Sequence, residues 1–166
     1  MRNQFAVTIA PNALQFFDRS GEEPARADFA GRVVGVSEQI SKLSGLGYAA
    51  IDLSFDIESR SASEELPSRV ILERLTRDDV LTGTKYRVIG ASARLWYTAA
   101  ERRYDLRIEP RGNQQDGVNY YAHLNAHIML KGHVPSAQWL SSTVQDEYKD
   151  FKRILIRILN QKRPEP

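Results

Sequence analysis

The chain has 166 residues, of which 42% are hydrophobic, and its 23 basic and 21 acidic side chains leave a net charge of only +2. This composition excludes an intrinsically disordered chain and a strongly basic nucleic-acid-binding domain, and the length suits one domain. Cysteine is absent, which excludes disulfides, thiolate metal sites and thiol nucleophiles.

The N-terminal region is predicted to form a β-hairpin and a helix. Apolar residues alternate over 4–9, as in a half-buried strand, and 13–17 is expected to return as its partner. Apolar residues then recur at helical spacing between 29 and 43. We therefore expect a helix that starts near Pro24 and ends near Gly45.

The N-terminal segment is not expected to direct the chain to a membrane. Pro11 and Asn12 interrupt its apolar run too early for a signal peptide, and no other stretch is long enough to span a bilayer. A chain of this size that has no disulfide also suits a reducing compartment. We therefore expect a cytoplasmic protein without a membrane partner.

The middle of the chain contains a clear strand and two further patterns. In "YAAIDLSFDIE", residues 48–58, apolar and polar side chains alternate as in a strand with one buried face. Residues 68–77 fit either a helix or a strand, and Pro67 favours a short helix. Residues 85–97 predict a strand in which the apolar side changes at Gly90, where we expect a β-bulge.

The C-terminal half is predicted to hold two more strands and a long helix. Residues 102–110 and 119–130 alternate between apolar and polar side chains. Apolar residues at alternating spacings of four and three predict an amphipathic helix over about 136–161, followed by a short disordered tail at 162–166. We expect an α+β fold in a single domain, 1–166. Its predicted architecture is a two-layer sandwich, with a mainly antiparallel sheet of about five strands and two long amphipathic helices on one face.

His123 and His127 are the candidate catalytic residues, because they stand four residues apart in "NYYAHLNAHIML". On a helix this spacing places two side chains ~6 Å apart, close enough to share a metal ion. The alternation predicts a strand instead, on which the same spacing is about 13 Å. We therefore expect no metal site and no cofactor here. Asp56 and Glu58, ~7 Å apart on their strand, could bind a hard cation or divide acid and base roles. They could also simply solvate the strand or pair with arginines of a neighbouring strand.

The outward-facing residues of three predicted strands combine arginines with aromatic and imidazole side chains. The candidate binding residues are Arg94, Trp96, Arg103, Arg107, Tyr121, His123, Asn125 and His127. On adjacent strands such residues can form a protein interface, or a surface that stacks bases and holds phosphates. They can also form a solvated face that is partly neutralised by Asp52, Asp56 and Asp105.

Three segments together resemble the layout of small uncharacterised bacterial α+β proteins. They are "GYAAIDLSFDIE", "YDLRIEP" and "NYYAHLNAHI" before a final helix, and the resemblance covers residues 5–160. It implies the α+β layout and no activity.

We expect a non-enzymatic protein-interaction module that binds a partner protein or itself, through the sheet face or the C-terminal helix. The alternative is a single-stranded nucleic-acid binder that uses the same face. A third hypothesis is a metal-independent phosphodiesterase that uses His123 or His127.

Overall fold

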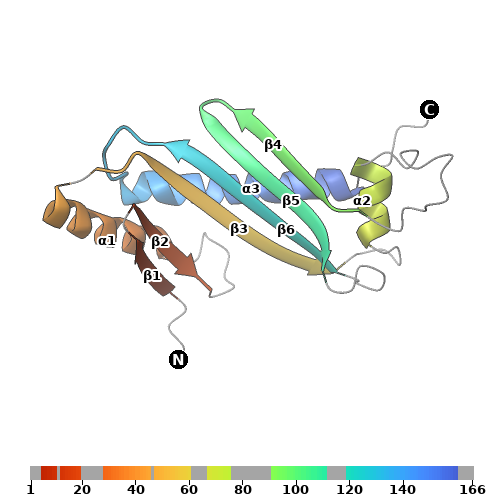
Figure 1. Ribbon diagram of the computed structural model, residues 1–166, viewed down its shortest axis with the longest axis horizontal. Coiled ribbons are helices and arrows are strands. Elements are labelled where there is room, and N and C mark those ends of the chain that lie inside the picture. The colour runs from red at the N-terminus through yellow and green to blue at the C-terminus, as the bar shows by residue number, and fades with distance from the viewer. Residues whose placement is uncertain are drawn as a thin grey trace. The chain divides into compact units, whose positions relative to one another are not determined.

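Strands and helices occur together in the chain, so the predicted α+β class is confirmed. The computed structural model describes residues 5–10, 12–19, 28–45, 47–60, 67–75, 91–111 and 119–160. In chain order the elements are β1 (Phe5–Ala10), β2 (Ala13–Asp18), α1 (Phe29–Ser44), β3 (Ala50–Arg60), α2 (Pro67–Leu75), β4 (Ala93–Ala99), β5 (Arg102–Arg111), β6 (Asn119–Met129) and α3 (Ala137–Asn160) (Figure 1).

The chain divides into two compact units. One unit comprises residues 1–51 and 129–149, and the other comprises 52–128 and 150–166. The sheet that carries the candidate site lies in the second unit. The assignment of 1–166 to a single domain stays a prediction.

The described strands form two sheets, and the prediction of one sheet with about five strands is wrong. β1 pairs only with β2, while the other four strands form a separate sheet in the order β3-β6-β5-β4 (Figure 1). The ring of Phe5 lies 6.2 Å from that of Phe16 and 5.8 Å from that of Phe29 in α1, so the hairpin packs within its own unit. Alternation in a sequence predicts which side of a strand is apolar but does not identify the strand it pairs with.

Glycines shape the end of α1 and the segment that follows it. Gly45 has a φ of 68° and donates its N–H to the Ser41 carbonyl at 2.8 Å, which is a left-handed helix cap. A Cβ atom on Gly47 would lie 2.2 Å from the carbonyl oxygen of Gly132, so this backbone approach requires glycine. The predicted helix end near Gly45 is confirmed.

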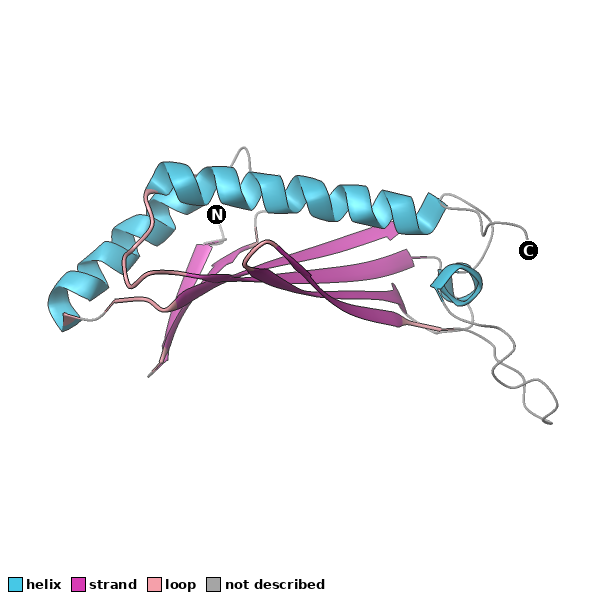
Figure 2. Cartoon of the chain, turned by 90° about the horizontal axis from the view of Figure 1, so that it is seen from above, coloured by secondary structure: helices cyan, strands magenta, loops and turns pink. Residues whose placement is uncertain are grey.

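One face of the four-stranded sheet carries the hydrophobic core of its unit. This core joins side chains of β5 and β6 to side chains of α2 and the C-terminal part of α3, which runs along that face in Figure 2. Its buried residues are Val70, Ile71, Leu106, Ile108, Tyr120, Ala122, Leu124, Phe151 and Leu155. Because side chains alternate along a strand, burying the even positions of β5 and β6 turns their odd positions to the opposite face.

Two further sequence predictions can be compared with the structure. Residues 67–75 form α2, so the helical reading of this segment is confirmed, and the long helix expected over about 136–161 is α3. The predicted helix start at Pro24, the bulge at Gly90 and the tail at 162–166 lie outside the described residues. None of the described helices is long and apolar enough to cross a bilayer.

Replacing Phe151 with Ala should destabilise the protein by about 3–5 kcal/mol, because this fully buried ring lies in the core between α3 and the sheet. The control Ile156→Ala, on the same helix but 58% exposed, should change stability by less than about 0.5 kcal/mol. Urea unfolding followed by circular dichroism measures both changes. Equal effects of the two substitutions would contradict the packing described.

Candidate functional site: the polar face of the four-stranded sheet

The face of the four-stranded sheet opposite the core carries polar and charged side chains from all four strands. We call it the polar face. The alternation of buried and half-buried residues is clearest in β6. Its even positions are buried, and the odd positions between them are only half-buried. The buried residues are Tyr120, Ala122, Leu124, Ala126 and Ile128. The structure thus confirms the strand predicted around the two histidines and brings all eight candidate binding residues onto one face.

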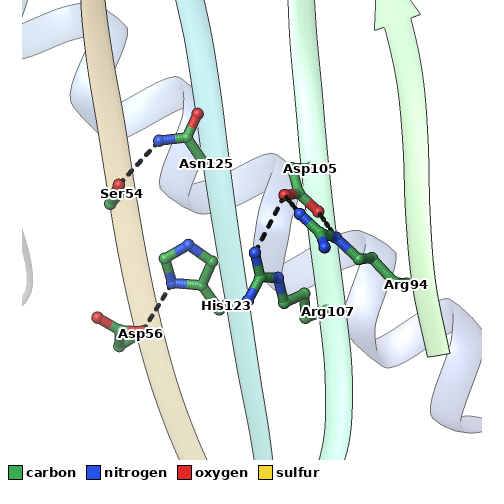
Figure 3. Close-up of polar contacts among 7 residues, drawn as sticks. All are labelled: Ser54, Asp56, Arg94, Asp105, Arg107, His123 and Asn125. Atoms are coloured by element: carbon green, nitrogen blue, oxygen red, sulfur yellow. Dashed lines mark hydrogen bonds and ion pairs between the residues drawn. The ribbon is translucent and has the colours of Figure 1, made fainter. Parts of the chain in front are cut away.

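The side chains of the polar face lie in rows that cross the four strands. The register between strands aligns β6 with β5 and β5 with β4, and side-chain hydrogen bonds connect β3 to β6. In the order β3, β6, β5, β4, the first row is Asp52, His127, Arg103 and Thr98. The middle row is Ser54, Asn125, Asp105 and Trp96. The last row is Asp56, His123, Arg107 and Arg94 (Figure 3).

Each histidine of the polar face is held by an aspartate of β3. Nδ1 of His123 lies 2.9 Å from Oδ1 of Asp56, and Nδ1 of His127 lies 2.9 Å from Oδ1 of Asp52. An ionised carboxylate can only accept, so Nδ1 carries the hydrogen in these contacts, and Nε2 of the neutral ring is then an acceptor. The two rows therefore repeat one arrangement, with a carboxylate on one side of an imidazole and an arginine on the other.

Asp56 accepts hydrogen bonds from two side chains of β6. The phenol of Tyr121 donates to the same Oδ1 that contacts His123. Burial raises the pKa of Asp56, but the hydrogen bonds from Tyr121 and His123 and the electrostatic interaction with His123 lower it, so the pKa lies below its ordinary value of 3.8. The hydrogen bond to Asp56 and partial burial raise the pKa of Tyr121 to about 12. Asp56 is thus ionised, and Tyr121 protonated, at neutral pH.

Asp105 neutralises part of the arginine charge on β4 and β5. Arg94 binds it through two hydrogen bonds, one of them 2.9 Å from Nε to Oδ1, and Arg107 lies 3.5 Å from the other carboxylate oxygen (Figure 3). The hydrogen bonds from Arg94 hold the pKa of Asp105 below its ordinary value. The guanidinium of Arg94 also lies 4.6 Å from the ring centre of Trp96, a residue that is 69% exposed.

Charge on the polar face is balanced but unevenly distributed. Apart from the histidines, the face carries five arginines (Arg60, Arg94, Arg103, Arg107, Arg111) and five carboxylates (Asp52, Asp56, Glu58, Asp105, Glu109). Three of the carboxylates lie on β3, whereas four of the arginines lie on β4 and β5. The face is therefore acidic at one edge and basic toward the other.

The geometry does not assemble a metal site from these side chains. Within the described ranges, no group of three or more His, Asp or Glu residues is placed to hold an ion. Asp56 and Glu58 are engaged separately, Asp56 by Tyr121 and His123, and Glu58 by Asn119 and Arg111. Glu58 pairs with an arginine, since its Oε2 lies 3.6 Å from Nε of Arg111. Arg111 lies on β5, however, which is two strands away from β3, so the prediction that the arginine belongs to the neighbouring strand is wrong.

The sequence predicted which residues share the face but not which of them pair. β3 was expected to be a half-buried strand, but its alternation of apolar and polar residues did not identify β6 as its neighbour. Asp52 and Asp56 were therefore expected on this face, but their pairing with the two histidines was not predicted. A usable signal was present, because Asp52, Ser54 and Asp56 have the same spacing as His127, Asn125 and His123 read in reverse.

Comparison with protein-family models, curated proteins and solved structures finds no significant match to this chain.

Replacing Asp56 with Asn should destabilise the protein at neutral pH by about 1 kcal/mol or less, because the carboxylate is 59% exposed. The pKa of Asp56 is lowered in the folded chain, so its contribution is present above the unfolded pKa and is lost as pH falls through the folded pKa. The stability difference between wild type and variant should therefore shrink below about pH 4. Urea unfolding over a range of pH measures this difference.

Glu38→Gln is the matched control, since it removes one exposed carboxylate of α1 outside this network. A difference between wild type and Asp56→Asn that stays constant or grows as the pH falls below about 4 would contradict the assigned hydrogen bonds.

Proposed function

We propose that the polar face binds a protein and that the chain acts as a non-enzymatic interaction module. The observation that carries this proposal is the composition of the face, which combines arginines with an exposed tryptophan and a tyrosine. The face also carries as many carboxylates as arginines. Arg, Trp and Tyr are enriched at protein interfaces, and balanced charge suits a partner that presents both signs. The outer surface of α3, the other candidate, carries pairs such as Asp150–Arg153, which are typical of a solvated helix.

The charge balance counts against the nucleic-acid alternative. Binding of a phosphate backbone depends on an excess of positive charge along the path of the strand. Here Asp105 engages Arg94 and Arg107, and Glu58 engages Arg111. The acidic side chains of β3 would repel phosphates at that edge of the sheet.

A photocrosslinking experiment tests the proposed function. The photoreactive residue p-benzoylphenylalanine replaces Trp96, which projects from the polar face, and in a control it replaces Ile156, which is 58% exposed on α3. Irradiation in cells that naturally produce the protein should give adducts from position 96 that protease digests and nuclease leaves intact. Position 156 should give few.

Adducts from position 96 that nuclease removes would support nucleic-acid binding in place of this proposal. Equal adduct yields from the two positions would contradict a specific binding role for the polar face.

The repeated aspartate–histidine contacts support a second candidate, a metal-independent phosphodiesterase. A carboxylate that fixes Nδ1 and leaves Nε2 exposed is the arrangement of a general base, and Arg103 or Arg107 could hold a phosphate beside it. The two imidazoles are about 13 Å apart along β6, so they cannot act as acid and base on one phosphorus atom. Each would have to act alone, which weakens this candidate.

Under the non-enzymatic proposal, the purified chain should hydrolyse bis(p-nitrophenyl) phosphate no faster than the variant His123→Ala/His127→Ala. Release of p-nitrophenol, followed by absorbance, measures both rates. A faster wild-type rate that the double variant loses while keeping its unfolding midpoint would establish catalysis and overturn the proposal.

A further inference from the structure

We infer that the partner of the polar face is a second copy of this chain, packed face to face about a two-fold axis parallel to the strands. This inference rests on the proposed function, since it names the protein that the face binds. It is carried by the distribution of charge on the face. The face is complementary to itself when the two-fold axis is parallel to the strands, and it is not when the axis is perpendicular to them.

The uneven charge of the four strands determines which two-fold arrangement brings opposite charges together. A two-fold axis parallel to the strands and between two polar faces places each row against the same row in reverse order. β3 of one copy then lies opposite β4 of the other, and β6 lies opposite β5. An axis perpendicular to the strands would place each strand opposite itself, so that the acidic side chains of β3 face one another and repel.

The last row illustrates the complementarity most directly. In reverse order it sets Asp56 of one copy opposite Arg94 of the other, an acid against a base. It also sets His123 opposite Arg107, whose guanidinium donates while Nε2 of the imidazole accepts. Both contacts occur twice in a symmetric dimer.

The other two rows match in the same orientation. In the middle row Asn125 lies opposite Asp105, and its amide has a second hydrogen to donate beyond the one given to Ser54. In the first row His127 lies opposite Arg103, which repeats the imidazole–guanidinium contact of the last row. In each row, therefore, the two central positions pair a donor with an acceptor.

The size and chemistry of the face predict a weak, salt-sensitive dimer. Four strands with about eight residues each cover on the order of 500 Å² per copy, close to the lower limit for a specific interface. Charged contacts contribute orientation more than affinity and are screened by salt. Two sheets packed in this way keep their strands within about 30° of each other, which leaves the central rows in contact.

Charge-reversed variants of the full chain test this orientation by analytical ultracentrifugation. Wild type should show a concentration-dependent dimer that added salt dissociates. Asp56→Lys and Arg94→Glu, each alone, should weaken the dimer by roughly tenfold or more, because each sets like charges together twice. An equimolar mixture of the two variants should recover dimers, since in the mixed dimer every reversed charge meets its opposite.

The equimolar mixture also distinguishes misfolding from charge repulsion, because a variant that fails to fold cannot form a dimer with the other variant. The charge reversal Asp150→Lys on α3 is the control and should leave dimerisation unchanged. A wild-type monomer at all concentrations, or a mixture that stays monomeric, would overturn the inference.

These outcomes are distinct from failure of the proposed function. If crosslinking at position 96 captures a different protein while the purified chain is monomeric, the interaction role stands and the second copy is excluded. If the purified chain is monomeric and position 96 gives no more adducts than position 156, the proposed function and the inferred dimer are both contradicted.

Discussion

The pairing register of β6 with its two neighbours determines which side chains meet on the polar face. β6 lies between β3 and β5, and its even positions are buried against the helices while its odd positions project outward. A shift of one residue would send the histidines into the core and bring Leu124 to the surface, at the cost of the buried apolar contacts. The hydrophobic side of the sheet therefore fixes the rows on the polar side.

Within those rows, hydrogen bonds and ion pairs hold the polar side chains in defined orientations. Asp56 is ionised and accepts from both Tyr121 and His123, and Asp105 draws Arg94 and Arg107 together. Such exposed contacts contribute little to stability individually. Their effect is to orient donors, acceptors and charges on an open surface, with acid concentrated on β3 and arginine on β4 and β5.

Local patterns in the sequence predicted the elements and the faces of the fold, while pairing between distant segments escaped prediction. The alternation in β6, the helical spacing of α3 and the cap at Gly45 depend on neighbouring residues, so they could be predicted without knowing the rest of the structure. The pairing of β3 with β6 joins segments about seventy residues apart, for example Asn125 with Ser54. Period-two alternation is the same whichever strand is the neighbour. This is why one sheet of about five strands was predicted, and why the pairing of the histidines with Asp52 and Asp56 was not.

The central claim is that β6 pairs with β5 and β3 in the register that makes the three rows. Cross-strand nuclear Overhauser effects between backbone protons test it most directly, on protein at neutral pH. The account predicts contacts from His123 to Arg107 on one side and to Asp56 on the other, and from Asn125 to Asp105. Contacts displaced by one residue, such as Arg107 with Leu124, would contradict the register and with it the composition of the polar face.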